Sequence, residues 1–500
     1  MRLENYIQVS GPLFEAVQKN QIFSDPKTFV DSYPKLNPKE VLALYEKEKC
    51  LSNFDLKQFV LKHFIFPEEE NSHPPHTGCI TDYIYSMWDI LQKEMTSPSP
   101  YGTLIPLPKP HIVPGGRFRE CFYWDSYFTA LGLASSGQIE SIKDMVTNFA
   151  FLIDRFGFIP NGNRVYFASR SQPPYFSYVL RLMLEQDEEE WALTFMPQLE
   201  AEYAYWMKGA ENLTENGAAH QSVVRIDEET ILNRYYDEKN VPRPEAFLRE
   251  IKLSEENPSP EFFRNLRAAC ASGWDFSSRW LEDPAKFQTI WALDLVPVDL
   301  NCLMYHLEWT LSDFAKRLNN KEKENHYSFL AEKRKEAILR LFWSEEKEFF
   351  FDYHFLKKKQ TNVWSLAGVS PLFNSLASKK QAEMVTRHLK EKFLLAGGFT
   401  TTLYEGIHQW DSPNGWAPLE WITIQGLLNY GENALAKEAA KRFVKLADNI
   451  YKQTGKVIEK YNVRDCSSLV ARGEYNLQEG FGWTNGVILA LIELFQLEGF

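Results

Sequence analysis

Residues 114–128 combine the side-chain types that bind a sugar ring. The segment, PGGRFRECFYWDSYF, places two arginines, two carboxylates and several aromatic rings in a short run. Aromatic planes stack on the C–H face of a sugar, and guanidinium and carboxylate groups bind its hydroxyls in pairs. A well-packed junction between a loop and a helix, with its charges satisfied, explains the same segment equally well. The segment alone therefore leaves both interpretations open.

Three arginines recur in similar loops, where each lies beside Gly, Pro or Gln and near aromatic residues. They are Arg117, Arg170 and Arg243. Such arginines either pin backbone carbonyls or serve as planar forks for vicinal hydroxyls and active-site carboxylates. The recurrence in three loops favours the second interpretation. Nearby polar side chains that add hydrogen-bonding groups are Asn161, Gln172 and Glu245.

Asp275 is a candidate general acid, because it stands between Trp274 and Phe276. Desolvation by aromatic neighbours favours the neutral carboxyl that an acid catalyst needs. An aspartate before a helical segment is also a common N-cap. The residues alone do not decide between these two roles.

Glu459 is a less distinctive carboxylate, in the segment Val457-Ile-Glu-Lys-Tyr461. The nearby Lys460 and Arg464 could keep it ionised, as a general base requires. On the residues alone, however, a carboxylate at the surface is the favoured interpretation.

Two further loops are dense in aromatic or glycine residues. Residues 409–418 place Trp410 and Trp416 on either side of a Pro-Asn-Gly turn, and residues 473–486 contain several glycines. Glycine lets a loop approach a ligand closely or move as a lid. Loops of this kind carry function on a rigid scaffold.

Composition excludes some classes of protein. The formal net charge of −12 over 500 residues makes nucleic acid an improbable partner, since phosphate binding needs a basic surface. Six scattered cysteines show no metal-ligand spacing, so we expect reduced thiols, no metal and no cofactor. The N-terminal residues lack a secretory pattern, and no apolar run could span a membrane. We therefore expect a cytoplasmic protein without membrane contact.

Helical periodicity dominates the chain. Between residues 435 and 450, apolar side chains recur at steps of three or four, and a glycine follows at 455. Similar stripes occur near 140–155, 188–207, 301–319, 325–343, 377–393, 418–430 and 485–498. Residues 349–353 are the best strand candidate, as one arm of a hairpin. We predict an all-α helical array or toroid over 101–500, with residues 1–100 as an N-terminal extension packed on it.

These blocks resemble the trehalases of glycoside hydrolase family 37. The two family signatures are similar to residues 114–127 and 409–418, and intermediate blocks occur in the same order at 160–164, 169–174, 243–245 and 272–280. The resemblance covers nearly the whole chain. It implies an (α/α)6 barrel that hydrolyses α,α-trehalose to two glucoses with inversion, and we expect a monomer whose only partner is this small substrate.

The same resemblance assigns roles to individual residues. It places the general acid at Asp275 and the general base at Glu459. The substrate-binding residues that it implies are Arg117, Phe118, Trp124, Asp125, Asn161, Arg170, Gln172, Arg243, Glu245, Gly273, Trp410 and Glu474. The chain departs from the family in residues 466–473, where many members carry a run of glycines, so a lid of altered shape or stiffness is expected there.

Other functions remain open at this point. An (α/α)6 glycosidase acting on a different α-glucoside or mannoside would share most of these features. A catalytically inactive disaccharide-binding protein would need neither carboxylate. A helical scaffold for protein partners explains the helices but not the loops rich in Trp and Arg.

Overall fold

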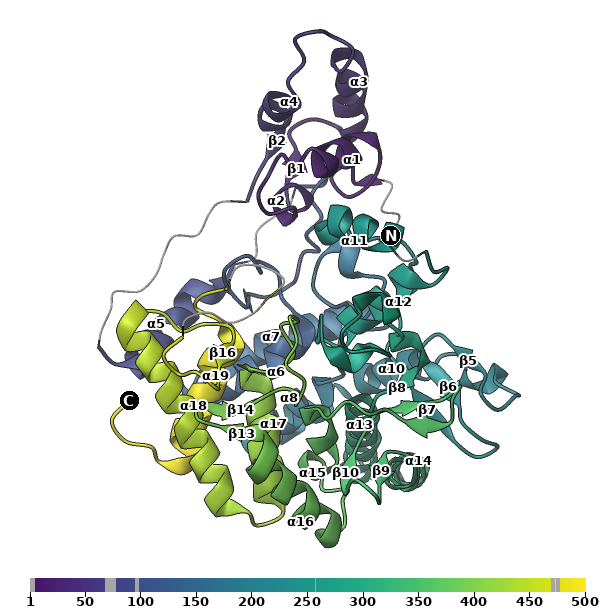
Figure 1. The fold of residues 1–500 in the computed structure, drawn as a ribbon, viewed down its shortest axis with the longest axis vertical. Coiled ribbons are helices and arrows are strands. Elements are labelled where there is room, and N and C mark those ends of the chain that lie inside the picture. The colour runs from purple at the N-terminus through teal and green to yellow at the C-terminus, as the bar shows by residue number, and fades with distance from the viewer. Residues whose placement is uncertain (1–4, 68–77, 95–98, 257, 469–472, 474–476) are drawn as a thin grey trace.

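The structure is a computed structural model that describes residues 5–67, 78–94, 99–256, 258–468, 473 and 477–500. Its inner helices, labelled in Figure 1, pack on one another in a closed ring within these residues. In order around the ring they are α6 (Tyr123–Ser135), α8 (Phe176–Glu185), α13 (Val298–Arg317), α15 (Ser370–Phe373), α17 (Ala417–Asn429) and α19 (Gly482–Phe495). Each packs on the next, and α19 closes the ring by packing on α6.

Outer helices alternate with the inner ones along the chain. They are α5 (Ile80–Leu91), α7 (Ile139–Phe156), α10 (Met196–Trp206), α14 (Lys321–Leu341), α16 (Lys379–His388) and α18 (Asn433–Thr454). Helix α7 packs on α6 and α8, α14 on α13, and α18 on α17 and α19. This alternation of inner and outer helices confirms the predicted all-α (α/α)6 barrel.

The outer and inner helices differ in how much of their surface is buried, and their side chains explain this difference. Helix α18 carries the predicted stripe, with Ala439, Phe443 and Ile450 buried and charged residues on the other face, and Gly455 ends it in the left-handed conformation. Helix α17 is buried over most of its length, as a helix enclosed by others must be. The predicted stripe at 188–207 divides into α9 (Glu189–Leu193) and α10.

Two glycines allow the closest contact in the inner ring. A Cβ at Gly132 of α6 would lie 2.4 Å from the Cα of Gly486 in α19, and one at Gly486 would lie 2.1 Å from the carbonyl oxygen of Phe128. No side chain fits at such separations. The backbones of α6 and α19 therefore meet directly, and the ring closes at this point.

The strands are short and lie in the loops between helices. The two-stranded antiparallel pairs are β1 (Tyr33–Pro34) with β2 (Phe64–Ile65), β3 (Gln92–Lys93) with β4 (His111–Ile112), β9 (Trp343–Ser344) with β10 (Phe349–Phe350), β13 (Leu394–Leu395) with β14 (Gly398–Phe399), and β15 (Asn414–Gly415) with β16 (Tyr461–Asn462). The three-stranded sheets are β5 (Ala219–His220), β6 (Val223–Arg225) and β7 (Ile231–Asn233), and β12 (Lys359–Gln360), β11 (Tyr353–His354) and β8 (Leu295–Val296). The predicted hairpin arm at 349–353 is divided: residues 349–350 form β10, which pairs with β9, whereas Tyr353 begins β11 in the second three-stranded sheet.

The N-terminal segment forms the projection at the top of Figure 1. It contains α1 (Pro12–Lys19), α2 (Lys27–Val30), α3 (Pro38–Glu48) and α4 (Leu56–His63), with an apolar cluster of its own. Phe122, Tyr166 and Phe167 of the barrel complete this cluster, and Phe14 packs on Phe247 of α11 (Phe247–Glu256) with ring centroids 5.0 Å apart. The segment is thus joined to the barrel by a shared core.

The division of the chain at residue 100 stays a prediction. Helix α5, which precedes it, packs on α18 and α19 of the barrel rather than among α1–α4.

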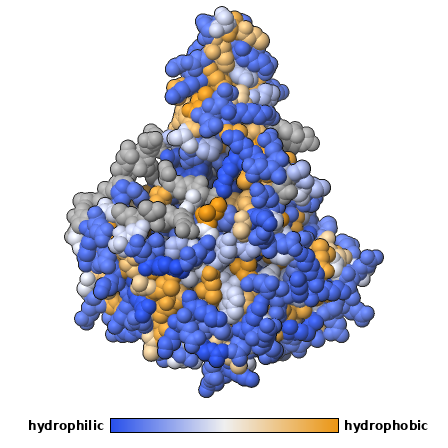
Figure 2. All heavy atoms as spheres, viewed as in Figure 1, coloured by the Kyte–Doolittle hydropathy of each residue, from blue (hydrophilic) through white to orange (hydrophobic). Residues whose placement is uncertain are grey.

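Figure 2 shows a largely hydrophilic face on the barrel, with apolar side chains along the projection. Exposed apolar residues of the projection are Leu36, Leu51, Leu61 and Ile65. Among the helices described, none combines the length and apolar character needed to cross a membrane.

Candidate active site

A cavity of about 720 Å³ is lined by residues from loops of the barrel and from the N-terminal segment. This volume suits a small organic ligand. The predicted site residues that line it are Arg117, Phe118, Trp124, Asp125, Asn161, Arg170, Gln172, Arg243, Glu245, Gly273, Asp275, Trp410 and Glu459. Glu474 and residues 469–472 of the divergent loop lie outside the described residues. Segments more than three hundred residues apart in the chain thus share one cavity.

Asp275 follows α12 (Phe262–Ala271), and its side chain is 33% exposed to the cavity. Its flanking rings do not enclose it. Trp274 stacks instead on Trp410, with centroids 5.4 Å apart, and Phe276 packs edge-on against Phe287. The desolvation expected from sequence neighbours is therefore only partial, because adjacent side chains point in different directions.

Asp275 is not a helix cap. The turn after it, Ser278–Trp280, is capped by Ser277, whose hydroxyl accepts a hydrogen bond from the Arg279 N–H at 3.2 Å. The Asp275 carboxylate instead lies 3.4 Å from Nη1 of Arg243. The N-cap interpretation is therefore wrong, and the carboxylate is available to the cavity.

Glu459 is buried, with 1% of its side chain exposed, so the expected surface position is wrong. Its Oε2 lies 2.8 Å from Nζ of Lys460, while Arg464 pairs with Glu405. Pairing of β15 with β16 turns this polar segment inward after α18 ends. Trp483 supports it by donating from Nε1 to the Glu459 carbonyl at 3.2 Å. Local polarity could not reveal this burial.

A chain of hydrogen bonds connects the two carboxylate-bearing segments. Lys460, which contacts Glu459, also donates to Oε1 of Gln409 at 3.2 Å. Nε2 of Gln409 donates to the Asp275 carbonyl at 2.5 Å. Gln409 belongs to the motif at 409–418 but was not among the predicted site residues. It holds the two segments at a set separation across the cavity.

Asp125, in the first turn of α6, is a third carboxyl group at the cavity. Burial raises its pKa well above the ordinary value, and the negative charges of Glu459 and Asp275 raise it further. These charges act on Asp125 because all three carboxyl groups lie close together. These surroundings favour the protonated form of Asp125.

The loop arginines bind carboxylates rather than backbone carbonyls. Arg243 donates through Nε to Glu250 at 2.5 Å, and its main-chain N–H donates to the same carboxylate at 2.7 Å. Arg170 donates through Nη1 to Asp237 at 3.2 Å. Both guanidinium groups also lie 4.0 Å from Glu245. These pairs hold the guanidinium planes against the cavity wall with little freedom to rotate.

Aromatic rings form one side of the cavity. Trp410 stacks on Trp416 with centroids 3.8 Å apart and planes inclined by 1°, and the edge of Trp483 meets both. Trp124 contacts Trp410 at a centroid distance of 5.8 Å. Such a rigid apolar wall suits the C–H face of a sugar. Trp483 comes from the first turn of α19 and lies within the glycine-rich segment 473–486, but it was not among the predicted site residues.

Residues of the N-terminal segment also line the cavity, and the sequence analysis did not predict them. Those that contribute are Gln18, Gln21, Phe23, Ser24, Asp25, Pro26 and Lys27. From α11, Leu248, Arg249, Lys252 and Leu253 do so as well. Residues 14–18 and 25–29 are similar to blocks in the N-terminal region of the same family, but that similarity gave them no role in a site. Neither this segment nor α11 shows the dense cluster of charged and aromatic residues that marked the other loops. Their position depends on how the projection packs on the barrel.

A helical barrel whose loops bring carboxylates, arginines and stacked tryptophans to one cavity defines a hydrolase of the glycosidase class. A family model described as trehalase matches residues 21–496, and the chain belongs to the trehalase family. The periplasmic trehalase of Citrobacter koseri is 42% identical over 97% of this chain and 85% of its own length. That of Escherichia coli O45:K1 is 41% identical over 97% and 86%.

A solved structure supports the same assignment. Neutral trehalase Nth1 from Saccharomyces cerevisiae superposes with a TM-score of 0.64 at 25% identity, covering 85% of this chain and 81% of its own. This similarity extends over most of the barrel. The fold and the family therefore agree.

The expected cytoplasmic location is contradicted by these relatives, which are named periplasmic trehalases. The expectation depended on the scattered cysteines and on the N-terminal residues. All six cysteines lie within the described residues, and none forms a disulfide there. Cysteines without disulfides are compatible with a reducing or an oxidising compartment, so their scatter along the sequence does not report the redox environment.

Proposed function

We propose that this protein hydrolyses α,α-trehalose to two glucoses, with inversion at the attacked carbon. The observation that carries the proposal is that Asp275 and Glu459, 184 positions apart by number, line the same cavity beside stacked tryptophans and fixed arginines. Membership of the trehalase family supports the choice of substrate.

In the proposed reaction Asp275 is the general acid and Glu459 the general base. Asp275 gives its proton to the oxygen that bridges the two rings as the glycosidic bond breaks. Glu459 takes a proton from a water, whose oxygen forms the new bond to the same carbon from the opposite face. Inverting enzymes hold the two carboxyl groups about 6.5–9.5 Å apart to admit that water. The proton lost by Asp275 and the one gained by Glu459 then exchange with solvent.

The two carboxylates differ in their surroundings, and this difference supports the assignment. Glu459 is buried against the ammonium group of Lys460, which stabilises the anion that a base needs. Asp275 is partly open to the cavity, where it can reach a bound ligand. Oxocarbenium character in the transition state is stabilised by the negative carboxyl groups around it.

The remaining cavity residues are proposed to orient the substrate. Arg170 and Arg243 are already fixed by Asp237 and Glu250, so binding costs them little side-chain entropy. Trp410 offers an apolar ring to a sugar face. We extend the same role to the other substrate-binding residues predicted above, Glu474 included. Orientation of both rings converts binding energy into rate.

Two variants test the assignment of the carboxylates. We expect Asp275→Asn and Glu459→Gln each to lose at least about 10²-fold in glucose release from trehalose, the low end for general acid–base catalysis. Glu346→Gln, at an exposed carboxylate away from the cavity, should retain native turnover and serves as the matched control. Near-native turnover in either cavity variant would remove that residue from the mechanism.

The anomeric form of the products tests inversion. Proton NMR in the first minutes should show equal amounts of α- and β-glucose, because one ring is inverted and the other is released unchanged. Formation of α-glucose alone would exclude inversion. Maltose and sucrose as substrate controls would reveal a different glycoside preference.

A further inference from the structure

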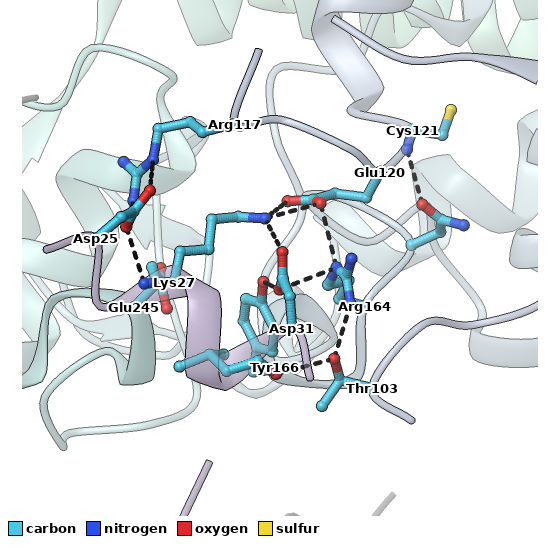
Figure 3. A network of polar contacts seen from close by, with 12 residues as sticks. Asp25, Lys27, Asp31, Thr103, Arg117, Glu120, Cys121, Arg164, Tyr166 and Glu245 are labelled. Carbon is cyan, nitrogen blue, oxygen red and sulfur yellow. Dashed lines mark hydrogen bonds and ion pairs between the residues drawn. The ribbon is translucent and has the colours of Figure 1, made fainter. Parts of the chain in front are cut away.

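The N-terminal segment touches the cavity at a residue with a specific partner. Asp25 precedes α2 and accepts two hydrogen bonds from Arg117, through Nε at 2.9 Å and Nη2 at 2.7 Å (Figure 3). The side chains are 37% and 19% exposed, respectively. A two-point contact between a carboxylate and a guanidinium sets both the place and the plane of the arginine.

Asp25 is itself held in a defined position. Its Oδ1 accepts a hydrogen bond from the main-chain N–H of Lys27 at 2.9 Å. The Lys27 ammonium is 4% exposed and lies 2.5 Å from Asp31 and 2.9 Å from Glu120. Glu120 is three residues after Arg117. The buried charges therefore join the same two segments that the contact between Asp25 and Arg117 joins (Figure 3).

Hydrogen bonds also link the main chain of Arg117 to the segment that carries Glu459, the proposed base. The Arg117 main-chain N–H donates to Oε1 of Gln478 at 2.8 Å, and the carbonyl of Gln478 accepts from the Glu459 N–H at 3.1 Å. Gly116 permits this contact, because a Cβ there would lie 2.3 Å from Oε1 of Gln478. Three segments distant in the chain thus meet at Arg117.

We propose that Asp25 is a positioning residue for substrate binding, and that the N-terminal segment forms a wall of the substrate site. The two hydrogen bonds from Asp25 hold the Arg117 guanidinium in one orientation at the cavity wall. Without this carboxylate, the Arg117 side chain would sample several rotamers, and it would lose that conformational entropy each time a substrate binds. The proposal depends on the function proposed above, since Arg117 is one of its substrate-binding residues.

Steady-state kinetics with trehalose test the proposal. We expect Asp25→Ala to raise KM by at least about tenfold with kcat changed by less than about threefold, the pattern of lost ground-state and transition-state binding alike. Asp25→Asn keeps an acceptor oxygen but no charge, so its KM should fall between those of the native protein and Asp25→Ala. Glu15→Ala removes an exposed carboxylate of the same segment, paired only with Lys19 in an exposed contact, and should leave KM unchanged.

A double-mutant cycle separates positioning from general damage. We expect Arg117→Ala and Asp25→Ala/Arg117→Ala to have equal kcat/KM, since Asp25 acts through Arg117. An equal loss on removing Asp25 in the presence and in the absence of Arg117 would overturn the proposal. So would an unchanged KM in Asp25→Ala. Absence of trehalose turnover by the native protein would instead overturn the proposed function.

Discussion

Replacement of Lys27 by methionine should destabilise the folded protein strongly, because Lys27 supplies the ammonium group that pairs with the buried carboxylates of Asp31 and Glu120. Its side chain is 4% exposed, and those of Asp31 and Glu120 are 1% and 0% exposed. In Lys27→Met, Arg164 would still face Asp31 and Glu120, at 3.3 and 3.1 Å, and the Tyr166 hydroxyl would still donate to Asp31, but the ammonium group would be lost. Removal of one member of a buried ion pair typically costs about 3–5 kcal/mol in free energy of unfolding.

Urea unfolding followed by tryptophan fluorescence measures this loss. At an unchanged m-value, a lower midpoint reports the change in unfolding free energy directly. Lys19→Met is the matched control, since Lys19 pairs with Glu15 at the surface, with side chains 57% and 48% exposed. An exposed pair contributes about 0.2–1 kcal/mol. We therefore expect Lys27→Met to lower the free energy of unfolding several times more than Lys19→Met does.

The pH dependence gives the same prediction a second readout. Burial alone would raise the pKa of Asp31, but the charges of Arg164 and Lys27 outweigh it and lower the pKa below the ordinary value. A carboxyl with a lowered folded-state pKa stabilises the fold above its unfolded pKa of about 3.9 and loses this contribution as pH falls through the folded value. The stability difference between the native protein and Lys27→Met should therefore narrow below about pH 4. Equal losses in the Lys27 and Lys19 variants, or a difference that does not change with pH, would refute the reasoning.

Three further predictions concern the barrel and the site. Burial raises the pKa of Glu202 to about 8, so the contribution of its protonated form to folding stability is present below about pH 4.5 and is lost as pH rises to 8. In urea titrations across that window, the unfolding free energy of the native protein should fall relative to that of Glu202→Gln by up to about 1.4 kcal/mol per pH unit. Parallel pH dependence of the two proteins would contradict this. Gly132→Ala should push α6 away from α19 and lower the free energy of unfolding by about 1–3 kcal/mol, which a lower thermal midpoint would report. An unchanged midpoint would show that the two helices can separate without loss of stability. Lys460→Met removes the ammonium 2.8 Å from Glu459, and we expect kcat to fall at least about tenfold in steady-state assays, whereas native kcat would exclude a role for this contact.

The sequence predicted the helices because their pattern is local. The stripe at 435–450 needs only the helical period to be recognised, and it became α18 with its glycine end. The loops rich in aromatic and charged residues marked segments that line the cavity, and the family resemblance named the individual residues within them. The family signatures then identified the fold.

Only the tertiary structure decided the surroundings of each side chain. Asp275 turned out not to be enclosed by its sequence neighbours, and Glu459 was buried although its segment is polar. Asp25 lines the cavity because the N-terminal projection packs on the barrel; residues 25–29 are similar to a family block, but that similarity did not place Asp25 at the site. Helical periodicity arises between residues three or four positions apart. Burial and charge pairing arise between segments that are distant in the chain, and their contacts exist only once the ring has closed.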